Sequence, residues 1–288
     1  MIAGLIQEQS RSWPVSVAGL CRLSGLPRRS YYRLVMSREL QDDHVYLRDQ
    51  IQRVAVEWPS YGYRRITREL GRRDIIANHK LVLRLMRSDN LLCLRRKRFM
   101  RTTDSGHRLP VYPNLAREMV LSGTDQLWVA DITYIRLISE FVYLAVLLDA
   151  FSRRCIGWAL GRRMEPMLTI AALKMALNSR DIRPGLVHHS DRGVQYCCHA
   201  YTQMLMEYGI LISMSRRGNP YDNARVERFM RTLKYDEVYM FEYRDMAEAR
   251  DRIGHFIEEV YNRKRLHSAI GYVPPVEFEQ LLINSSAP

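Results

Sequence analysis

The chain of 288 residues has only five cysteines, none of them in a C-x-x-C pair, and no long apolar stretch. The cysteine pattern argues against a zinc ribbon or a disulfide framework and favours a reducing setting. No run approaches the roughly 18 uninterrupted apolar residues of a membrane-spanning helix, and no basic-then-apolar signal pattern opens the sequence. We therefore expect a cytoplasmic protein that has no membrane association.

Acidic residues are fewer than basic residues. The 44 Lys and Arg outnumber the 31 Asp and Glu, which gives a formal net charge of +13. This excess of positive charge attracts polyanions over long distances. Solvated basic faces are common, however, so net charge alone does not show that the protein binds nucleic acid. A hydrophobic fraction of 47% is enough for a buried core, and the length suits two or three domains.

The first half predicts short, Arg-rich helices. Residues 16–36 predict two helices joined by a Gly turn, and residues 61–92 predict a second such pair, with Arg64 and Arg65 facing outward. A helix-turn-helix has this shape and places its second helix in the DNA major groove, whereas an αα-hairpin with a basic outer face explains one such pattern equally well. Two consecutive basic pairs favour DNA. We assign helix-turn-helix-like segments to residues 1–46 and 47–105.

A linker is predicted over residues 106–121, where hydrophobic periodicity is lost. A basic run precedes it, made of Arg95, Arg96, Lys97 and Arg98. Such a run suits contact with a phosphate backbone, and the alternative is a solvated tether. The DNA contact is favoured, because the neighbouring helical pairs are also basic.

The second half changes to strands, in the order strand, strand, strand, helix, strand, helix, strand. Residues 125–137 alternate as a half-buried strand and place Asp131 in its middle, on a largely apolar face. A carboxylate there is costly unless it is paired, hydrogen-bonded or bound to metal. Asp191 ends the later strand at 185–191, and this end of a strand is where ligands gather in open α/β sheets.

A third carboxylate, Glu227, lies on the helix predicted over 223–238, which either Asp222 or Asn223 can cap. Glu227, Arg231 and Lys234 share one stripe of that helix. By itself this is an ordinary surface helix with a Glu–Arg pair. Together, carboxylates from a strand, a strand end and a helix suit a site for a hard cation such as Mg²⁺, and on a basic protein they indicate phosphodiester chemistry on nucleic acid.

Ordered motifs support this interpretation. They are W-x-x-D-I-T-Y at 128–134, L-D-x-F-S-R at 148–153, G-W at 157–158, H-S-D-R-G-x-Q-Y at 189–196, S-M-S-R-x-G-N-x-Y-D-N-A at 213–224, E-R-F at 227–229, L-K at 233–234 and Y-N-x-x-R-x-H-S-A-I-G-Y at 261–272. Asp131 and Asp191 are separated by 59 residues, and Asp191 and Glu227 by 35. In these features residues 122–280 resemble the catalytic core of the orfB-type transposases of the IS-three family of bacterial insertion sequences, relatives of retroviral integrases. WPSYGYRRI at 58–66 and RLMR at 84–87 resemble the family's N-terminal region.

The resemblance implies a fold and an activity. The fold is α/β and ribonuclease-H-like, with a mixed β-sheet flanked by helices over 122–240, a helical extension over 241–288 and an all-α helix-turn-helix-like region before them. The activity is that of a DNA transposase, with metal-dependent strand cleavage and strand transfer at element ends. Asp131, Asp191 and Glu227 would be its DDE triad and would hold two Mg²⁺ or Mn²⁺ ions.

The implied partners are double-stranded DNA of the terminal inverted repeats and of the target, and further copies of the chain on that DNA. The expected DNA-contact residues are Lys234, Arg231, Arg228, Arg64, Arg65, Arg95, Arg96, Lys97 and Arg98. An upstream-frame, orfA-type product, fused or separate, is a further expected partner, since no sustained heptad repeat appears in this chain.

Two other functions stay open from the residues: a ribonuclease-H-like nuclease that does not join strands, and an inactive, transposase-derived DNA-binding repressor. Rival polar residues also have structural explanations. Asp149 is a spare metal ligand or, preferably, a structural residue, and Glu237 is a helix-face residue. His188 and His189 are best explained as a packed strand-end pair, and His267 by packing or DNA contact rather than as a metal ligand.

Overall fold

Two compact units make up the chain, Met1–Cys93 and Leu94–Pro288. The computed structural model describes residues 16–32, 44–91, 109–216 and 223–286. The expected basic run at 95–98 and the expected cap Asp222 therefore lie outside the described residues.

The described part of the first unit is helical. Its helices are α2 (Val17–Ser24), α4 (Val45–Glu57), α5 (Tyr63–Arg72) and α6 (His79–Ser88). Helix α2 begins where Ser16 Oγ accepts a hydrogen bond from Gly19 N at 3.3 Å. It ends at Gly25, whose φ of 70° is the left-handed conformation that favours glycine. The other three helices pack together through apolar stripes that bury residues such as Ile51, Ile66 and Val82.

The second unit contains a five-stranded mixed sheet. Its strands are β1 (Leu127–Arg136), β2 (Phe141–Asp149), β3 (Cys155–Gly161), β4 (Val187–Ser190) and β5 (Leu211–Met214). They lie in the order β3-β2-β1-β4-β5. The first three strands form an antiparallel meander, whereas β4 is parallel to both β1 and β5. This confirms the predicted ribonuclease-H-like sheet.

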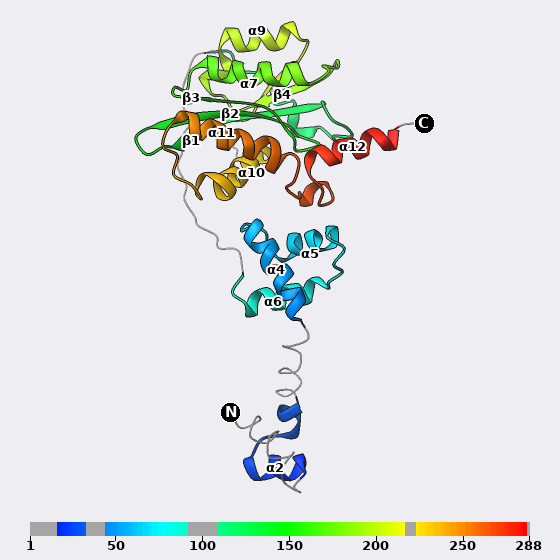
Figure 1. The fold of residues 1–288 in the computed structure, drawn as a ribbon. Helices are drawn as coiled ribbons and strands as arrows, with labels where there is room; N and C mark the ends of the chain where they lie inside the picture. Colours follow the sequence, from blue (N-terminus) through cyan, green and yellow to red (C-terminus); the bar gives the residue numbers. More distant parts are fainter. Residues whose placement is uncertain (1–15, 33–43, 92–108, 217–222, 287–288) are drawn as a thin grey trace. The chain divides into compact units, whose positions relative to one another are not determined.

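Helices cover both faces of the sheet (Figure 1). They are α7 (Pro166–Ser179), α8 (Val194–Cys197), α9 (His199–Glu207), α10 (Ala224–Leu233), α11 (Met246–His255) and α12 (Pro275–Ser286). Shorter turns are the 3-10 helices Ala116–Glu118 and Ser268–Ile270 and the π-helices Lys234–Val238 and Phe256–Tyr261, which continue α10 and α11. Helices α7, α8 and α9 share one apolar cluster with the sheet, and α10 and α11 share the other.

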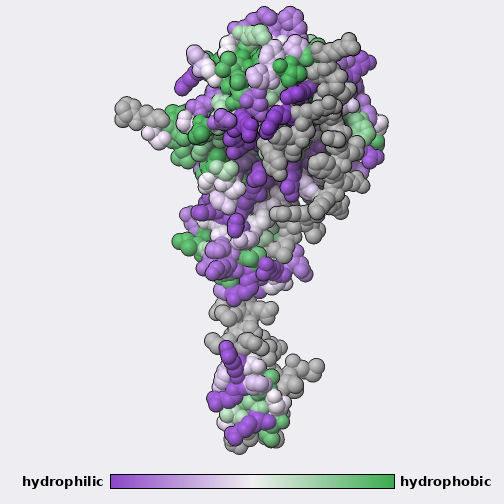
Figure 2. All heavy atoms as spheres, turned by 180° about the vertical axis from the view of Figure 1, so that it is seen from behind, coloured by the Kyte–Doolittle hydropathy of each residue, from purple (hydrophilic) through white to green (hydrophobic). Residues whose placement is uncertain are grey.

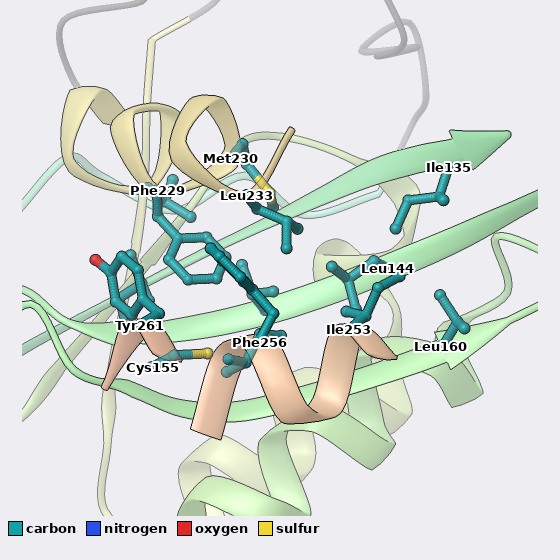
Figure 3. Packing of buried hydrophobic residues seen from close by; sticks show 14 of the residues in the cluster. Ile135, Leu144, Cys155, Leu160, Phe229, Met230, Leu233, Ile253, Phe256 and Tyr261 are labelled. Carbon is teal, nitrogen blue, oxygen red and sulfur yellow. The ribbon is translucent and has the colours of Figure 1, made fainter. Parts of the chain in front are cut away.

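The alternation of β1 divides its residues between these two clusters. Leu127 and Val129 pack with α10 and α11, while Trp128 and Ala130 pack with α7 and α9. On the first side, α10 is docked by its buried apolar stripe, in which the Phe229 ring lies 4.7 Å from the ring of Tyr261 (Figure 3). By the same alternation, Asp131 belongs to the face that α10 covers.

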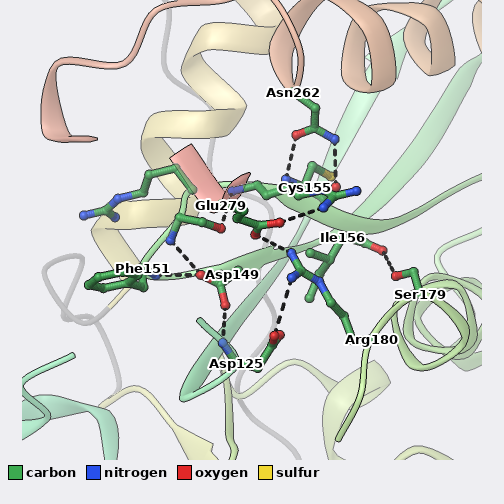
Figure 4. A network of polar contacts seen from close by, with 12 residues as sticks. Asp125, Asp149, Phe151, Cys155, Ile156, Ser179, Arg180, Asn262 and Glu279 are labelled. Carbon is green, nitrogen blue, oxygen red and sulfur yellow. Dashed lines mark hydrogen bonds and ion pairs between the residues drawn. The ribbon is translucent and has the colours of Figure 1, made fainter. Parts of the chain in front are cut away.

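Polar contacts fasten the C-terminal segment to the sheet (Figure 4). Glu279 of α12 is buried and accepts hydrogen bonds from Arg154 Nη1 and Arg180 Nη2, both at 2.6 Å. The side chain of Asn262 exchanges two hydrogen bonds with the backbone of Cys155, at 2.9 and 3.0 Å. These buried, charge-assisted contacts fix α12 beside the turn between β2 and β3.

Asp149 lies within the same network. Its carboxylate accepts three backbone N–H groups, from Asp125 at 2.7 Å, Phe151 at 2.9 Å and Ser152 at 2.7 Å. Desolvation raises the pKa of Asp149, and these hydrogen bonds act in the opposite direction. The carboxylate thus shapes the turn after β2, and the three bonds account for its burial.

Replacing Glu279 with alanine is expected to lower the free energy of unfolding by about 3 kcal/mol, because the buried Arg180 would lose its 2.6 Å carboxylate partner and keep only Asp125, at 3.4 Å. Urea denaturation followed by circular dichroism measures the loss. Glu140→Ala breaks the exposed ion pair with Arg162 and is the matched control, expected to cost less than about 1 kcal/mol. Equal losses in the two variants would contradict the role given to Glu279.

Candidate active site

The parallel pair of β1 and β4 brings two of the predicted carboxylates side by side. Val129 is in register with His189. Asp131 follows Val129 by two residues within β1, and Asp191 follows His189 by two residues, one position beyond the end of β4. Neighbouring strands lie about 4.8 Å apart, so this pairing brings both residues to the same end of the β1–β4 pair. Asp191 Oδ1 accepts a hydrogen bond from Gly193 N at 2.9 Å, which orients the carboxylate in the turn after β4. Two carboxylates therefore meet at the carboxyl end of β4.

The position of Gly193 leaves little room for a side chain. A Cβ atom there would lie 3.0 Å from Asp191 Oδ1 and 3.0 Å from Gln195 Oε1. A larger residue would press directly on the carboxylate that its own N–H orients. The Asp-Arg-Gly turn thus combines a hydrogen-bond donor with the space that Asp191 needs.

Helix α10 places the third carboxylate near the other two. Asn223 Nδ2 donates to the carbonyl oxygen of Ala130 at 3.1 Å and so ties the start of α10 to the residue before Asp131. Asn223 occupies the N-cap position of α10, one of the two positions expected for the cap, but it makes no side-chain capping bond, because its amide bonds to the strand instead. Glu227 follows four residues later, on an exposed position of the first turn.

The charges of the three carboxylates interact. The pKa of Asp131 is raised to about 8, first by desolvation and then by the charge of Asp191, with a smaller contribution from Glu227. The N–H of Ile132, which donates to Asp131 at 2.9 Å, and the charge of Lys234 oppose the rise. Desolvation also raises the pKa of Glu227. The three residues predicted from separate motifs thus belong to one electrostatic group.

The group is not a preformed cage. Within the described residues, no three His, Cys, Asp or Glu side chains gather closely enough to hold a metal ion as they stand. Their chemistry nevertheless fits a divalent ion, because all three donors are carboxylate oxygens, which Mg²⁺ and Mn²⁺ prefer.

Cationic side chains border this group. Lys234 Nζ lies 4.6 Å from the centroid of the Tyr134 ring on β1, and its own pKa is lowered by desolvation. The guanidinium of Arg231 lies 5.7 Å from the Tyr235 ring, and Arg228 is exposed on α10. The structure therefore brings Lys234 to Asp131.

The other expected DNA-contact residues belong to the first unit. Arg64 is exposed on α5 and its guanidinium lies 5.6 Å from the Tyr63 ring, and Arg65 lies 5.6 Å from the Tyr61 ring. Aromatic contacts of this kind hold a guanidinium near the surface without removing its charge.

Most of the rival residues are structural. His188 is buried and its Nε2 lies 2.9 Å from the Tyr201 hydroxyl, and His189 Nδ1 lies 2.8 Å from Ser213 Oγ, which confirms a packed pair. His267 packs on the Tyr261 ring at 4.6 Å. Glu237 lies on the helix Lys234–Val238 that continues α10, as expected. It is 7% exposed and accepts hydrogen bonds from Tyr243 and Arg252.

Family comparisons agree with this geometry. The integrase core domain family matches residues 122–220, a second integrase core domain family matches residues 208–275, and the HTH-like domain family matches residues 41–99. A 31 kDa protein of the insertion element IS600 from Shigella sonnei is 36% identical over 91% of this chain and 97% of its own length. The chain belongs to the family of insertion-sequence transposases with an integrase core domain.

Two further relatives of this chain are named as transposases. The transposase of insertion sequence element IS904 from Lactococcus lactis is 36% identical over 76% of this chain and 87% of its own length. Transposase InsF of IS3A from Escherichia coli is 33% identical over 92% of this chain and 94% of its own length. These relatives support a DNA transposase over a nuclease that does not join strands and over an inactive repressor.

The surface of the transposase is polar over much of its visible face, with hydrophobic side chains in smaller patches (Figure 2). In the part of the chain that the structure describes, none of the helices has the length and apolar character needed to cross a bilayer.

Asp131→Asn is expected to raise the melting temperature of the metal-free transposase by a few degrees at about pH 8. The raised pKa means that the folded chain binds a proton that the unfolded chain has lost, so stability falls as pH rises from the ordinary value of 3.8 toward about 8. Asparagine has no such penalty. Differential scanning fluorimetry in EDTA measures the effect.

The control is Asp251→Asn, which changes an exposed carboxylate on α11. Its melting temperature should follow that of the wild type at every pH. If the difference between Asp131→Asn and the wild type failed to grow from about pH 5 to about pH 8, the electrostatic coupling at Asp131 would be wrong.

Proposed function

We propose that Asp131, Asp191 and Glu227 are the catalytic carboxylates of this transposase and that together they hold two Mg²⁺ or Mn²⁺ ions. The observation that carries the proposal is the raised pKa of Asp131, which the charges of both other carboxylates increase. The bound ions would supply activation of the attacking hydroxyl and neutralisation of the leaving oxygen in an in-line displacement at phosphorus. This accounts for both cutting and joining by one site.

The surrounding residues have distinct tasks in this proposal. Asp131 offers its carboxylate from the rigid central strand, and Gly193 N keeps the Asp191 carboxylate in its orientation. Lys234, held against Tyr134, positions a phosphate of the element end as a point charge and does not read bases. Glu227 completes the set from α10, whose start is bound to Ala130.

The proposed partner is double-stranded DNA, both the terminal inverted repeats and the target, in the cytoplasm. The HTH-like match over residues 41–99 and the net charge of +13 support DNA contact by the first unit. Arg64, Arg65, Arg228 and Arg231 are proposed phosphate contacts, as is the run 95–98. Work on both element ends at once requires more than one copy of the chain, and an orfA-type product, fused or separate, is a further proposed partner.

Asp191→Asn is expected to reduce strand cleavage and joining at least about 100-fold, because the amide keeps the shape of the side chain but loses a charged metal ligand. Labelled duplexes that carry an element end, incubated with Mg²⁺ and separated on denaturing gels, measure both products. Binding of the same duplex should change little, since the substitution removes no cation.

Asp251→Asn, the exposed carboxylate on α11, should cut and join as the wild type does. Full joining by Asp191→Asn would remove the assignment of the metal site, and nicked products without joined ones from the wild type would favour the nuclease.

A further inference from the structure

Three arginines gather on the flank of α10 that faces away from the carboxylates. Arg153 lies in the turn between β2 and β3, and Arg225 and Arg228 lie in the first turns of α10. The Tyr261 hydroxyl donates to the carbonyl oxygen of Arg153 at 3.1 Å, and the Tyr261 ring packs on Phe229 of α10 at 4.7 Å. The turn and the helix are thus joined through one tyrosine.

The helical period separates this flank from the carboxylate flank. At about 100° per residue, Arg225 and Arg228 lie roughly 60° apart around the α10 axis, whereas Lys234 and Glu227 lie within roughly 20° of each other. Arg228 and Arg225 are turned from Glu227 by roughly 100° and 160°. The arginine cluster is therefore distinct from the carboxylate group although both use α10.

The arginines lack an adequate counter-charge. Desolvation lowers the pKa of Arg153, and the charges of Arg225 and Arg228 lower it further. The Nε atom of Arg153 is buried and has no hydrogen-bond partner among the described residues. A buried N–H without a partner among the described residues, on a guanidinium that two others repel, is costly by itself.

Asp149 is a carboxylate close enough for its charge to raise the pKa of Arg153. Both of its oxygens already accept backbone N–H groups, from Asp125, Phe151 and Ser152. One carboxylate whose oxygens already accept backbone hydrogen bonds does not neutralise three guanidinium charges. A bound anion would supply the missing negative charge.

The backbone of Arg153 is also unusual. Its φ of 67° lies in the left-handed region, which is uncommon for a residue with a side chain. Residues held in such conformations cluster at ligand-binding sites, where the surrounding structure offsets the strain. Here the Tyr261 hydrogen bond to the Arg153 carbonyl oxygen holds the turn.

We propose that Arg153, Arg225 and Arg228 form a binding site for one backbone phosphate of the DNA that the transposase cuts and joins. Guanidinium groups suit this ligand, because their planar N–H forks match two phosphate oxygens at once. The proposal rests on the proposed function in one respect, since DNA must reach α10 for the site to be used. It joins Arg228, already a proposed phosphate contact, with Arg153 and Arg225 in one site on the other flank of α10 from Lys234.

Arg153→Gln is the direct test, because glutamine keeps a polar side chain but no charge. A fluorescein-labelled duplex of arbitrary sequence, titrated in EDTA at several salt concentrations, measures affinity by anisotropy. We expect binding about 10-fold weaker than wild type and a slope of log K against log salt that is smaller by about one phosphate contact. Arg225→Gln should behave in the same way, and the double variant should lose less than the sum of the two.

Lys174→Gln is the matched control, because it removes one exposed positive charge from α7 on the opposite face of the sheet. Its salt slope should equal that of the wild type. An equal loss of slope in Lys174→Gln and Arg153→Gln, or no loss in Arg153→Gln, would overturn the phosphate site. A general effect of net charge would be the explanation in the first case.

Melting temperature separates binding from a structural role. Removing one of three repelling guanidiniums should leave the melting temperature of Arg153→Gln equal to or above that of the wild type, and inorganic phosphate should stabilise the wild type more than the variant. A lower melting temperature with unchanged phosphate stabilisation would instead make Arg153 structural. All these measurements omit metal, so they do not depend on the carboxylate assignment, which joining by Asp191→Asn tests separately.

Discussion

The half-buried position of Asp131 on a central strand is the constraint on which the rest of the catalytic unit depends. A carboxylate at that position loses hydration, and the neighbouring charge of Asp191 adds repulsion, so its pKa rises to about 8. An apolar residue would suit the strand better for stability alone. The parallel pairing of β1 with β4 and the Asn223 bond to Ala130 O nevertheless bring further charge toward it. The arrangement makes physical sense as a site whose ligand is a cation.

Helix α10 lies between two groups of like charge, carboxylates on one flank and arginines on the other. Its Glu227 flank faces a group of carboxylates, and its Arg225 flank faces Arg153. Stability must come from elsewhere, and the apolar stripe that includes Phe229 and the buried Glu279 contacts supply it. A metal ion would neutralise the negative charge on one flank, and a phosphate would neutralise the positive charge on the other. We therefore expect metal binding and DNA binding to stabilise the same helix.

The features of the site that could be predicted from the sequence are those that follow from local periodicity. The period of two along β1 indicated that Asp131 lies on a largely apolar face, and the stripe on α10 indicated that Glu227 and Lys234 share a side. The motifs, through their resemblance, indicated a mixed, ribonuclease-H-like sheet. Periodicity shows which face a residue occupies but not which distant element covers that face. The Asn223 amide, which bonds a carbonyl 93 residues away, was therefore expected to be a cap. For the same reason the sequence did not indicate that Tyr243 and Arg252 bury Glu237, and no pattern joins Arg153 to Arg225.

The claim that Asp131, Asp191 and Glu227 hold the metal is tested most directly by crystals soaked in Mn²⁺ and measured at the manganese absorption edge. The account predicts anomalous peaks about 2.0 to 2.2 Å from carboxylate oxygens of Asp131 and Asp191, with Glu227 turned toward them. Peaks at Asp149 or elsewhere, with none beside Asp131, would contradict it.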